Sequence, residues 1–448
     1  MQVIVVGAGQ VGSDIAAGLC QDHDVVVIDL DGDRVDRLTY DLDVLAMEGD
    51  GTDLETLREA GIGDADLLIA STDDDETNIV VCGTARVEGS AFTIARVKRP
   101  QYLSTWEHAT EIGGDALGVD FMVCTDLLAA ETIADVTGVP TAEDVKSFAD
   151  GAVRMAEFQI PDESPVTGVT VTEADRFPGL TFAAIFRGEE TIIPQGSTVL
   201  RAGDDLVTIG RPEELAAFAS QLAPDQSDPD DVVIFGGSEV GYQTARILSN
   251  RGLDARLVER DGTRARWLAE HLPGVTVMNH DATDQEFLER ENVGEADVVV
   301  AALDTDQQNL LATLLAKRLG ASRAAAVVDT VEFTELFEAV GVDVAVSPRT
   351  VAAEEITRFT RARYAETVSL LEHDRAEVLE LEVSPESPVA GRSVSEAVVE
   401  VFPDGVVIGA VTRNGDCIIP RGDTRIEAGD HLVVFVETEN ADEVASLL

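Results

Sequence analysis

Short apolar runs alternate with amphipathic segments at the start of the chain. Residues 2–6, 25–28 and 67–70 are apolar runs of strand length, and a helix-like pattern begins near Val11. Buried strands that alternate with helical segments are typical of a parallel, doubly wound sheet. We therefore expect an α/β fold in this part of the chain.

The same pattern occurs twice. The glycine-rich segment at residues 7–12 recurs at residues 236–241, and each copy follows an apolar run and precedes a helix-like stretch. Internal repeats of this length indicate duplicated domains. We expect the following pairs of equivalent residues: Asp29 and Glu259, Asp50 and Asp281, Asp66 and Asp297, Asn78 and Asn309, Arg96 and Asp329, Asp120 and Asp343, Glu131 and Glu354.

Each half changes character near residues 140 and 363, where short strands with frequent Gly and Pro replace the first pattern. We predict two tandem Rossmann-like domains with doubly wound parallel sheets, each followed by a small α+β domain. The predicted domains are residues 1–137, 138–223, 231–358 and 359–448. Residues 224–230 are polar with two prolines and are expected to link the halves.

The first glycine motif is in the context of a dinucleotide-binding turn. Its glycines suit a tight turn at Gly7, close approach of a pyrophosphate at Gly9 and helix packing at Gly12. The following helix would offer free N–H groups to the phosphates. Asp29, about 20 residues on, is placed to bind a ribose diol and to repel a 2′-phosphate. NAD(H) or another adenosine phosphate is therefore favoured over NADP, and a glycine turn kept for packing alone is the alternative.

The second motif departs from this pattern because Ser238 replaces the middle glycine. Its hydroxyl and Cβ would crowd a pyrophosphate, although Glu259 still supplies an acid. The second half is therefore either a nucleotide site of different affinity or a vestigial fold.

Charged residues follow two later strands of the first half. Asp73 and Glu76 have the spacing of a helix cap, but Thr72 and Asp73 also lie where parallel sheets bind ligands. Arg96, Lys98 and Arg99 end the next strand and could recognise phosphate. An ion-paired surface patch is the alternative.

The composition adds an unusual charge. The chain has 448 residues, 85 Asp and Glu against 32 Lys and Arg, and a formal net charge of −53. Only three lysines occur. Such a surface resembles that of proteins from salt-accumulating halophiles, because molar salt shortens the Debye length to ~3 Å. The alternative is an acidic protein with an acidic partner. No basic stripe is present for nucleic acid.

Several functional classes are not indicated by the sequence. No apolar run approaches the ~20 residues of a membrane span, and the N-terminus does not resemble a secretory signal, so we expect a cytoplasmic protein. Four widely spaced cysteines suggest buried thiols rather than a metal or disulfide framework. Six scattered histidines give no catalytic grouping, so no enzyme is expected.

The motifs together resemble those of the Trk potassium-uptake regulatory subunits, which join two regulator-of-potassium-conductance (RCK) units in one chain. The resemblance rests on the doubled plan and on the segments at residues 7–12, 29–34, 75–78, 94–97 and 194–204. It implies a protein that binds NAD(H) and, alternatively, ATP or ADP, and that assembles as a tetramer beneath a TrkH-type membrane potassium transporter and gates it. It also implies a peripheral location at the inner face of the membrane.

Motifs and resemblance together give the candidate cofactor-binding residues. In the first half these are Gly7, Ala8, Gly9, Gln10, Val11, Gly12, Asp29, Asp50, Gly51, Thr72, Asp73, Arg96 and Lys98. In the second half they are Gly236, Ser238, Glu239, Val240, Gly241, Glu259 and Asp281. An NAD-dependent dehydrogenase and an oligomeric scaffold with inactive sites are the alternatives, and titration with nucleotides would separate them.

Overall fold

The computed structural model describes most of the chain. The described residues are 1–20, 23–111, 117–137, 139, 142–188, 190–223, 229–361, 367–371, 375–413 and 415–448. They divide into two compact units, each made from two stretches of chain. The first unit contains Met1–Ile133 and Asp231–Thr357, and the second contains Ala134–Asp230 and Arg358–Leu448. Residues 224–228 of the expected linker lie outside the described residues.

The first half contributes a six-stranded parallel sheet with the order β3-β2-β1-β4-β5-β6. This is the Rossmann order, in which β1 and β4 lie side by side and the later strands are added outward from them in opposite directions along the sheet. The strands are β1 (Gln2–Val6), β2 (Asp24–Asp29), β3 (Leu45–Glu48), β4 (Leu67–Ala70), β5 (Phe92–Val97) and β6 (Phe121–Cys124). The helices are α1 (Gln10–Leu19), α2 (Gly32–Asp41), α3 (Leu54–Glu59), α4 (Asp75–Glu88), α5 (Pro100–Glu111) and α6 (Thr125–Thr137).

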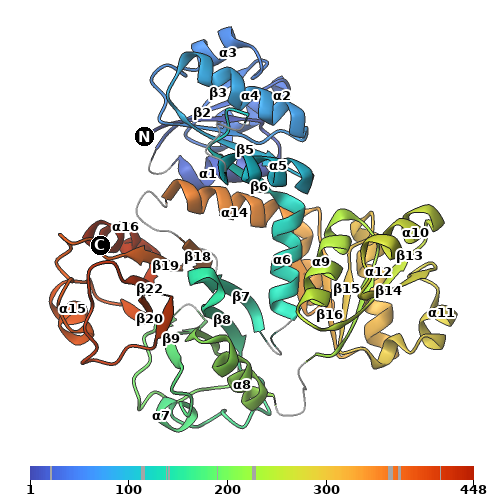
Figure 1. Ribbon diagram of the computed structural model, residues 1–448, viewed down its shortest axis with the longest axis vertical. Coiled ribbons are helices and arrows are strands. Elements are labelled where there is room, and N and C mark those ends of the chain that lie inside the picture. Colours follow the sequence, from blue (N-terminus) through green and yellow to red (C-terminus); the bar gives the residue numbers. More distant parts are fainter. Residues whose placement is uncertain are drawn as a thin grey trace. The chain divides into compact units, whose positions relative to one another are not determined.

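The second half repeats this sheet with the order β14-β13-β12-β15-β16-β17 (Figure 1). Its strands are β12 (Asp231–Phe235), β13 (Asp254–Glu259), β14 (Val275–Asn279), β15 (Val298–Ala301), β16 (Arg323–Val327) and β17 (Val344–Val346). Its helices are α9 (Glu239–Asn250), α10 (Gly262–His271), α11 (Gln285–Arg290), α12 (Asp306–Leu319), α13 (Thr334–Ala339) and α14 (Pro348–Arg361), with 3-10 turns at Val293–Glu295 and Val331–Phe333.

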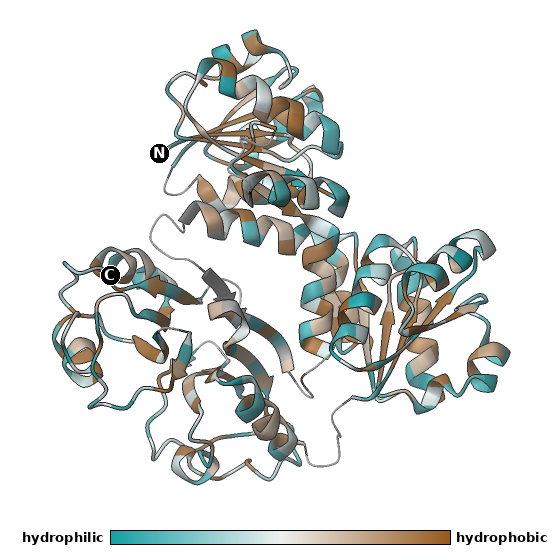
Figure 2. Cartoon of the chain, in the orientation of Figure 1, coloured by the Kyte–Doolittle hydropathy of each residue, from teal (hydrophilic) through white to brown (hydrophobic). Residues whose placement is uncertain are grey.

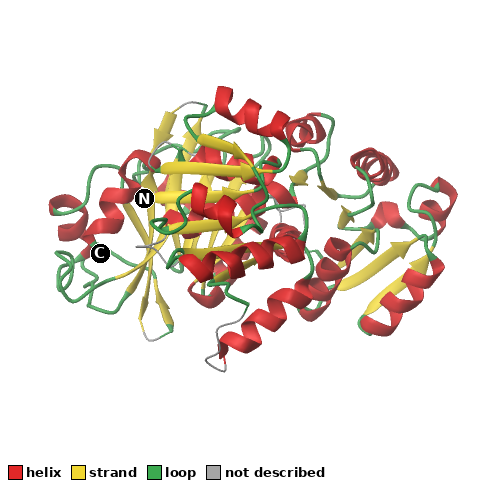
Figure 3. Ribbon diagram, turned by 90° about the horizontal axis from the view of Figure 1, so that it is seen from above, coloured by secondary structure: helices red, strands yellow, loops and turns green. Residues whose placement is uncertain are grey.

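The central strands of both parallel sheets are buried on both faces. Every residue of β4 and β15 is buried, as expected for strands covered by helices on both sides. These strands are mostly brown in Figure 2, and the helices that cover them turn hydrophilic residues outward. Figure 3 shows helices on both sides of the parallel strands. The predicted α/β class is confirmed.

Equivalent residues of the two halves make equivalent hydrogen bonds. The Nδ2 of Asn78 donates to the carbonyl of Arg96 at 2.8 Å, and the Nδ2 of Asn309 donates to that of Val327 at 2.8 Å. Asp120 and Asp343 each accept a hydrogen bond from the backbone of the neighbouring strand. The duplication predicted from the sequence is therefore a structural repeat.

The second unit contains two five-stranded antiparallel sheets with the orders β10-β9-β11-β8-β7 and β18-β19-β22-β20-β21. The first sheet has β7 (Ala142–Phe148), β8 (Val153–Gln159), β9 (Leu180–Arg187), β10 (Glu190–Ile192) and β11 (Asp205–Gly210), with helices α7 (Val171–Ala174) and α8 (Pro212–Leu222) and a 3-10 turn at Ala149–Gly151. The second has β18 (Thr367–Leu371), β19 (Ala376–Glu382), β20 (Val407–Arg413), β21 (Asp416–Ile418) and β22 (His431–Glu437), with α15 (Val394–Glu400), α16 (Ala441–Leu447) and a 3-10 turn at Thr438–Asn440.

The two antiparallel sheets share one apolar core. Phe186 and Phe435 are both buried, with their ring centroids 6.4 Å apart. Gly409 lies so close to the other sheet that a Cβ there would approach Ile209 to 2.6 Å. Because a side chain at Gly409 would push the sheets apart, the residue has to be glycine.

The repeated Ala-Gly-Asp segments have the same structural role in the two halves of this unit. The buried carboxylate of Asp204 accepts two hydrogen bonds from Arg187, each of 2.6 Å. Asp430 accepts two from Arg413, of 2.7 and 2.8 Å. Forked pairs of this kind compensate a buried carboxylate well.

The cysteines correct one expectation. Cys82 and Cys124 are buried, whereas Cys20 and Cys417 are only half-buried, and all four thiols are free. Burial raises the pKa of Cys124 to about 12. Cys20 is less buried than predicted and lies at the C-terminal end of α1.

Candidate functional site

A cleft of about 320 Å³ opens at the carboxyl ends of β1 and β4 in the first half. This is the topological switch point, where open α/β sheets bind ligands. Ten of the predicted residues line it: Gly7, Gly9, Gln10, Val11, Asp29, Asp50, Gly51, Thr72, Asp73 and Arg96.

Three predicted residues of the first half do not line the cleft. Ala8 is buried and contributes its backbone N–H to Asp29. Gly12 packs against the turn, since a Cβ there would lie 1.8 Å from the carbonyl oxygen of Gly7. Lys98 stands outside, with its Nζ 3.4 Å from Asp73 Oδ1. Ala8 and Gly12 therefore shape the cleft without facing it.

The glycine turn leaves the start of α1 open to the cleft. Gly7 has a φ of +109°, which favours glycine, and a Cβ there would come within 2.9 Å of the Ser71 backbone. A Cβ at Gly9 would meet only the Arg34 guanidinium, at 3.8 Å. No side chain caps α1 at Gly9, so the N–H groups of its first turn have no side-chain acceptor there. The turn can thus receive an anion on backbone N–H groups.

Asp29 fixes the loop at one end of the cleft. Its Oδ2 accepts a hydrogen bond from Ala8 N at 2.5 Å, and its Oδ1 accepts one from Asp31 N at 2.8 Å. Arg34 lies 3.8 Å from the same carboxylate. A carboxylate has about four acceptor positions, so Asp29 keeps capacity for a ligand hydroxyl.

The acidic turn after β4 corrects the predicted helix cap. Asp74, not Asp73, caps α4, because its side chain accepts a hydrogen bond from Thr77 N at 2.8 Å. Asp73 lines the cleft instead, 3.8 Å from Arg96 and 3.4 Å from Lys98. Partial burial acts to raise the pKa of Asp73, but the charges of Lys98 and Arg96 outweigh it and lower that pKa.

Arg96 is the buried cation of the site. Its side chain is 4% exposed, its Nε donates to Thr125 Oγ1 at 3.1 Å, and its Nη1 donates to the carbonyl of Thr72 at 3.2 Å. Burial lowers its pKa, but a guanidinium stays charged in proteins. Its nearest carboxylate is the exposed Asp73, at 3.8 Å. The cleft thus contains a buried positive charge with weak compensation.

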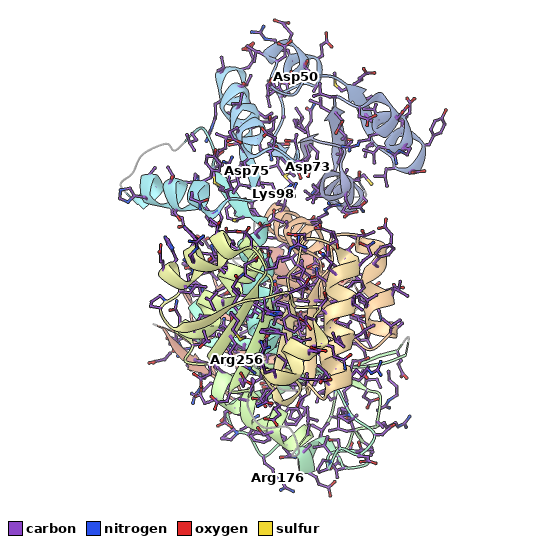
Figure 4. All side chains as sticks on the ribbon, turned by 90° about the vertical axis from the view of Figure 1, so that its right-hand side faces the viewer. Asp50, Asp73, Asp75, Lys98, Arg176 and Arg256 are labelled. Atoms are coloured by element: carbon purple, nitrogen blue, oxygen red, sulfur yellow. The ribbon has the colours of Figure 1, made fainter. Side chains whose placement is uncertain are left out.

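The predicted cationic triplet separates into two environments. Arg99 lies 3.2 Å from Asp75 and 2.5 Å from Glu76 and donates to Tyr102, which is the surface ion-pair patch of the alternative interpretation. Figure 4 shows Asp73, Asp75 and Lys98 close together on the first Rossmann domain. Only Arg96 of the three faces the cleft.

Sequence reasoning missed several residues that line the first cleft. They are Val6, Ile28, Leu30, Arg34, Gly49, Ser71, Thr77 and Arg349. Leu30 is 71% exposed and gives the cleft an apolar edge beside Asp29. Arg34 belongs to the segment at residues 29–34 that supported the family resemblance, and this was a usable signal. Arg349 comes from the second half, and no local pattern points to it.

The second cleft is much smaller, about 50 Å³. Of the predicted residues, Gly236, Ser238, Glu259 and Asp281 line it, while Glu239, Val240 and Gly241 do not. Its other lining residues are Gly237, Val258, Arg260, His280, Ala282, Thr283, Ala302, Leu303, Asp304 and Gln308.

In the second glycine turn, side chains of the protein form hydrogen bonds with backbone groups. The Oγ of Ser238 accepts a hydrogen bond from Gly241 N at 3.2 Å and donates to the carbonyl of Ala302 at 2.8 Å. Arg264 donates to the carbonyl of Gly237 at 2.7 Å. Ser238 thus closes the start of α9 with its own hydroxyl.

The strand register corrects one predicted pair. Ala95 lies beside Ala70 and Ala326 beside Ala301, so Arg96 is equivalent to Val327. The backbone N–H of Lys98 donates to Asp75 at 2.9 Å, as that of Asp329 does to Asp306 at 2.7 Å. Asp329 therefore takes the place of Lys98, not that of Arg96. An apolar strand has no sequence marker of register, which explains the two-residue error.

The described residues contain neither a metal-binding cluster nor a membrane-spanning helix. Among the described residues, no three His, Cys, Asp or Glu side chains gather as a metal ion would require. No helix in the described ranges combines the length and apolar character needed to cross a bilayer. His280 stacks on Phe287 with a centroid distance of 4.1 Å and lines the second cleft.

The fold and its two clefts define a class: tandem Rossmann-type domains, each followed by a small α+β domain. Models of the TrkA-N domain match residues 3–119 and 232–348, and models of the TrkA-C domain match residues 155–223 and 378–448. The chain therefore belongs to the TrkA family, and the resemblance noted from its motifs is confirmed.

Known relatives extend over the whole chain. The Trk system potassium uptake protein TrkA homolog 1 of Methanosarcina mazei is 37% identical over 452 residues, covering 99% of each chain. The fold is that of the GsuK RCK domain, with a TM-score of 0.62, 20% identity and coverage of 100% of this chain and 94% of that one. The GsuK channel bound to NAD gives 0.60 at 20% identity, covering 100% and 78%.

Proposed function

We propose that the protein is the nucleotide-binding regulatory subunit of a membrane potassium transport system. The observation that carries this proposal is the first cleft, which combines an uncapped helix N-terminus, a ribose-side acid and a buried arginine. These three groups match the phosphates, sugar and distal part of an adenine nucleotide. NAD(H) is the proposed ligand, with ATP or ADP as alternative effectors.

The residues that line the cleft suggest an orientation for the bound nucleotide. An adenosine would lie at Asp29, with Leu30 as an apolar surface for the base, and its pyrophosphate would lie on the turn from Gly7 to Gly12. The remaining part would reach Thr72, Asp73 and Arg96. Asp29 and Asp31 disfavour a 2′-phosphate, which supports NAD(H) over NADP.

The second cleft is proposed as a weaker or vestigial site. Its volume and the cap that Ser238 places on α9 both act against a bound pyrophosphate. Glu259 accepts a hydrogen bond from Gly237 N at 2.8 Å and so keeps the loop geometry of Asp29. We therefore propose that the candidate residues of this half stabilise the loop at least as much as they bind a ligand.

Family membership and fold support the partner. A relative at 37% identity is named a potassium uptake protein, and a structure of the GsuK channel, which shares this fold, is bound to NAD. We propose that the chain gates a TrkH-type transporter, assembles as a tetramer and lies in the cytoplasm against the inner face of the membrane.

A regulatory role is favoured over a dehydrogenase by the residues of the cleft. None of the side chains that line the first cleft, all of them described, is His, Lys, Tyr or Cys. A hydride-transfer enzyme needs an acid or base beside the nicotinamide, and these are its usual donors. The nucleotide is therefore proposed as an effector.

Calorimetric titration of the purified chain with NADH, NAD, ATP and ADP in molar salt tests the proposal. Asp29→Asn should weaken NADH binding by about 1.5–3 kcal/mol, the scale of hydrogen bonds to a charged acceptor. The exposed Asp36→Asn on α2 is the matched control and should leave binding unchanged. Absence of binding would favour the scaffold alternative, and NADH oxidation with any 2-oxo acid would favour a dehydrogenase.

A further inference from the structure

Arg349 brings a cation of the second half into the cleft of the first. It occupies the first turn of α14 and lines the first cleft together with Asp73 and Arg96. Its helix also lies against α1, where a Cβ on Gly18 would approach Thr357 Cγ2 to 3.5 Å. The first cleft is therefore incomplete without the second half.

The charge of Arg349 acts on the groups at the distal end of this cleft. Burial lowers the pKa of Arg96, and Arg349 adds to this effect, because two guanidinium groups share one region. Two neighbouring cations repel each other. The exposed carboxylate of Asp73 interacts with both of them and compensates their charge only in part. A phosphate at this place would relieve the repulsion and could take a fork from each arginine.

The residue equivalent to Arg349 in the first half has the opposite charge. Arg349 lies three residues before Ala352-Ala353-Glu354, and Asp126 lies three residues before Ala129-Ala130-Glu131. Each begins the helix that follows the last strand of its sheet. Burial and then the negative charge of Glu239, at the start of α9 in the second half, raise the pKa of Asp126. Each helix thus presents its residue toward the other half.

The charge also differs between the halves at other equivalent positions around the two glycine turns, and at four of them the first half is the more positive. The pairs, first half then second, are Gln10 and Glu239, Arg96 and Val327, Lys98 and Asp329, and Arg349 and Asp126. At these four positions the first half has three cations and the second has three carboxylates, while Leu30 and Arg260 differ in the opposite sense. This reversal favours phosphate at the first site and disfavours it at the second.

We infer that Arg349 is a phosphate-binding residue of the first cleft, which recognises the distal phosphate of an adenine nucleotide. The inference rests on the proposed function and adds a residue from the second half to it. Because Arg349 belongs to the other Rossmann domain, phosphate bound there joins the two domains. By linkage, occupancy and association of the two domains strengthen each other.

Binding of ADP and of adenosine to Arg349→Gln tests the assignment at matched molar salt. Arg318→Gln, an exposed arginine at the end of α12 in the same half, removes the same charge far from either cleft and is the control. Arg349→Gln should weaken ADP roughly tenfold and leave adenosine unchanged, since only ADP carries phosphate. Arg318→Gln should change neither.

Each result has a defined meaning. Equal ADP affinity in Arg349→Gln and the wild type would overturn the inference, as would an equal loss for adenosine. A wild type that binds neither ADP nor NADH would instead defeat the proposed function itself. If Arg349→Gln melts well below the wild type, Arg349→Lys serves in its place. This variant should lose roughly two- to fourfold, because an ammonium cannot form the fork, and an unchanged affinity would then overturn the inference.

Discussion

The hydroxyl of Ser238 accepts a hydrogen bond from the backbone N–H of Gly241 at 3.2 Å and thereby occupies the start of α9. At the equivalent turn of the first half, Gly9 leaves the start of α1 without a side-chain cap. The two halves therefore differ in whether backbone N–H groups are available to a ligand.

Ser238→Gly should open the second turn at little cost in stability. Glycine at an N-cap lowers helix stability by only a few tenths of a kcal/mol relative to serine. We expect the melting temperature to change by less than about 2 °C and a second ADP binding event to remain weak, because Glu239, Asp329 and Asp126 stay in place. Calorimetry of the variant checks both values, and a second site as tight as the first would show that the hydroxyl alone excludes phosphate.

Arg96 and Lys98 should contribute unequally to nucleotide binding. Arg96 lines the cleft with a buried guanidinium, whereas Lys98 stands outside and is close to Asp73. Arg96→Lys should weaken ATP roughly tenfold through loss of the fork, and more than it weakens NADH. Lys98→Ala should change either affinity by less than about threefold. Similar losses for the two variants would contradict this division.

Asp126 should make stability depend on pH. Burial raises the pKa of its carboxyl to about 6, and the charge of Glu239 adds to the shift. Between pH 3.8 and about 6 the folded chain retains a proton that the unfolded chain has lost, so this group's contribution to stability falls as pH rises through that window.

Asp126→Asn should remove the loss of stability that ionisation of Asp126 causes as the pH rises. The variant should gain about 1–2 kcal/mol over the wild type at pH 7 and little at pH 4, because the neutral amide replaces a carboxylate that is ionised only at the higher pH. Urea unfolding at several pH values measures the difference. Asp36→Asn is the exposed control, and a gain of equal size at pH 4 and pH 7 would exclude titration of Asp126 as the cause.

Stability should also depend on salt. The formal net charge of −53 repels itself, and the range of the repulsion grows as the Debye length lengthens from ~3 Å in molar salt to ~10 Å at 0.1 M. We expect the melting temperature to fall sharply over that range. Calorimetric scans in potassium chloride check it, with an uncharged osmolyte as the control for crowding. A constant melting temperature would contradict adaptation to high salt.

The sequence predicts the repeated fold and the glycine turns because both depend on local rules. Gly7 and Gly12 are needed by backbone geometry that is set within one strand, turn and helix. Asp29 can be identified from its distance along the sequence from the glycine turn. The position of Asp74 as the helix cap could not be chosen among consecutive acids, since each of them suits a cap.

Arg349 could not be predicted for a different reason. It lies more than 200 residues from the rest of the cleft, and its place depends on how the two Rossmann domains associate. The register of β16 was missed because its alanines and valine repeat without a marker. In both cases the missing information is tertiary, and no window of sequence contains it.

The core shared by the two antiparallel sheets, where Phe186 approaches Phe435, joins the halves as two subunits of a dimer would be joined. In a true homodimer every substitution appears twice, so an arginine at one site would also appear at its partner. Fusion of the two copies into one chain removes that constraint. It allows one gene to place opposite charges at equivalent positions, with Arg349 in one copy and Asp126 in the other, as the proposed difference in phosphate binding requires.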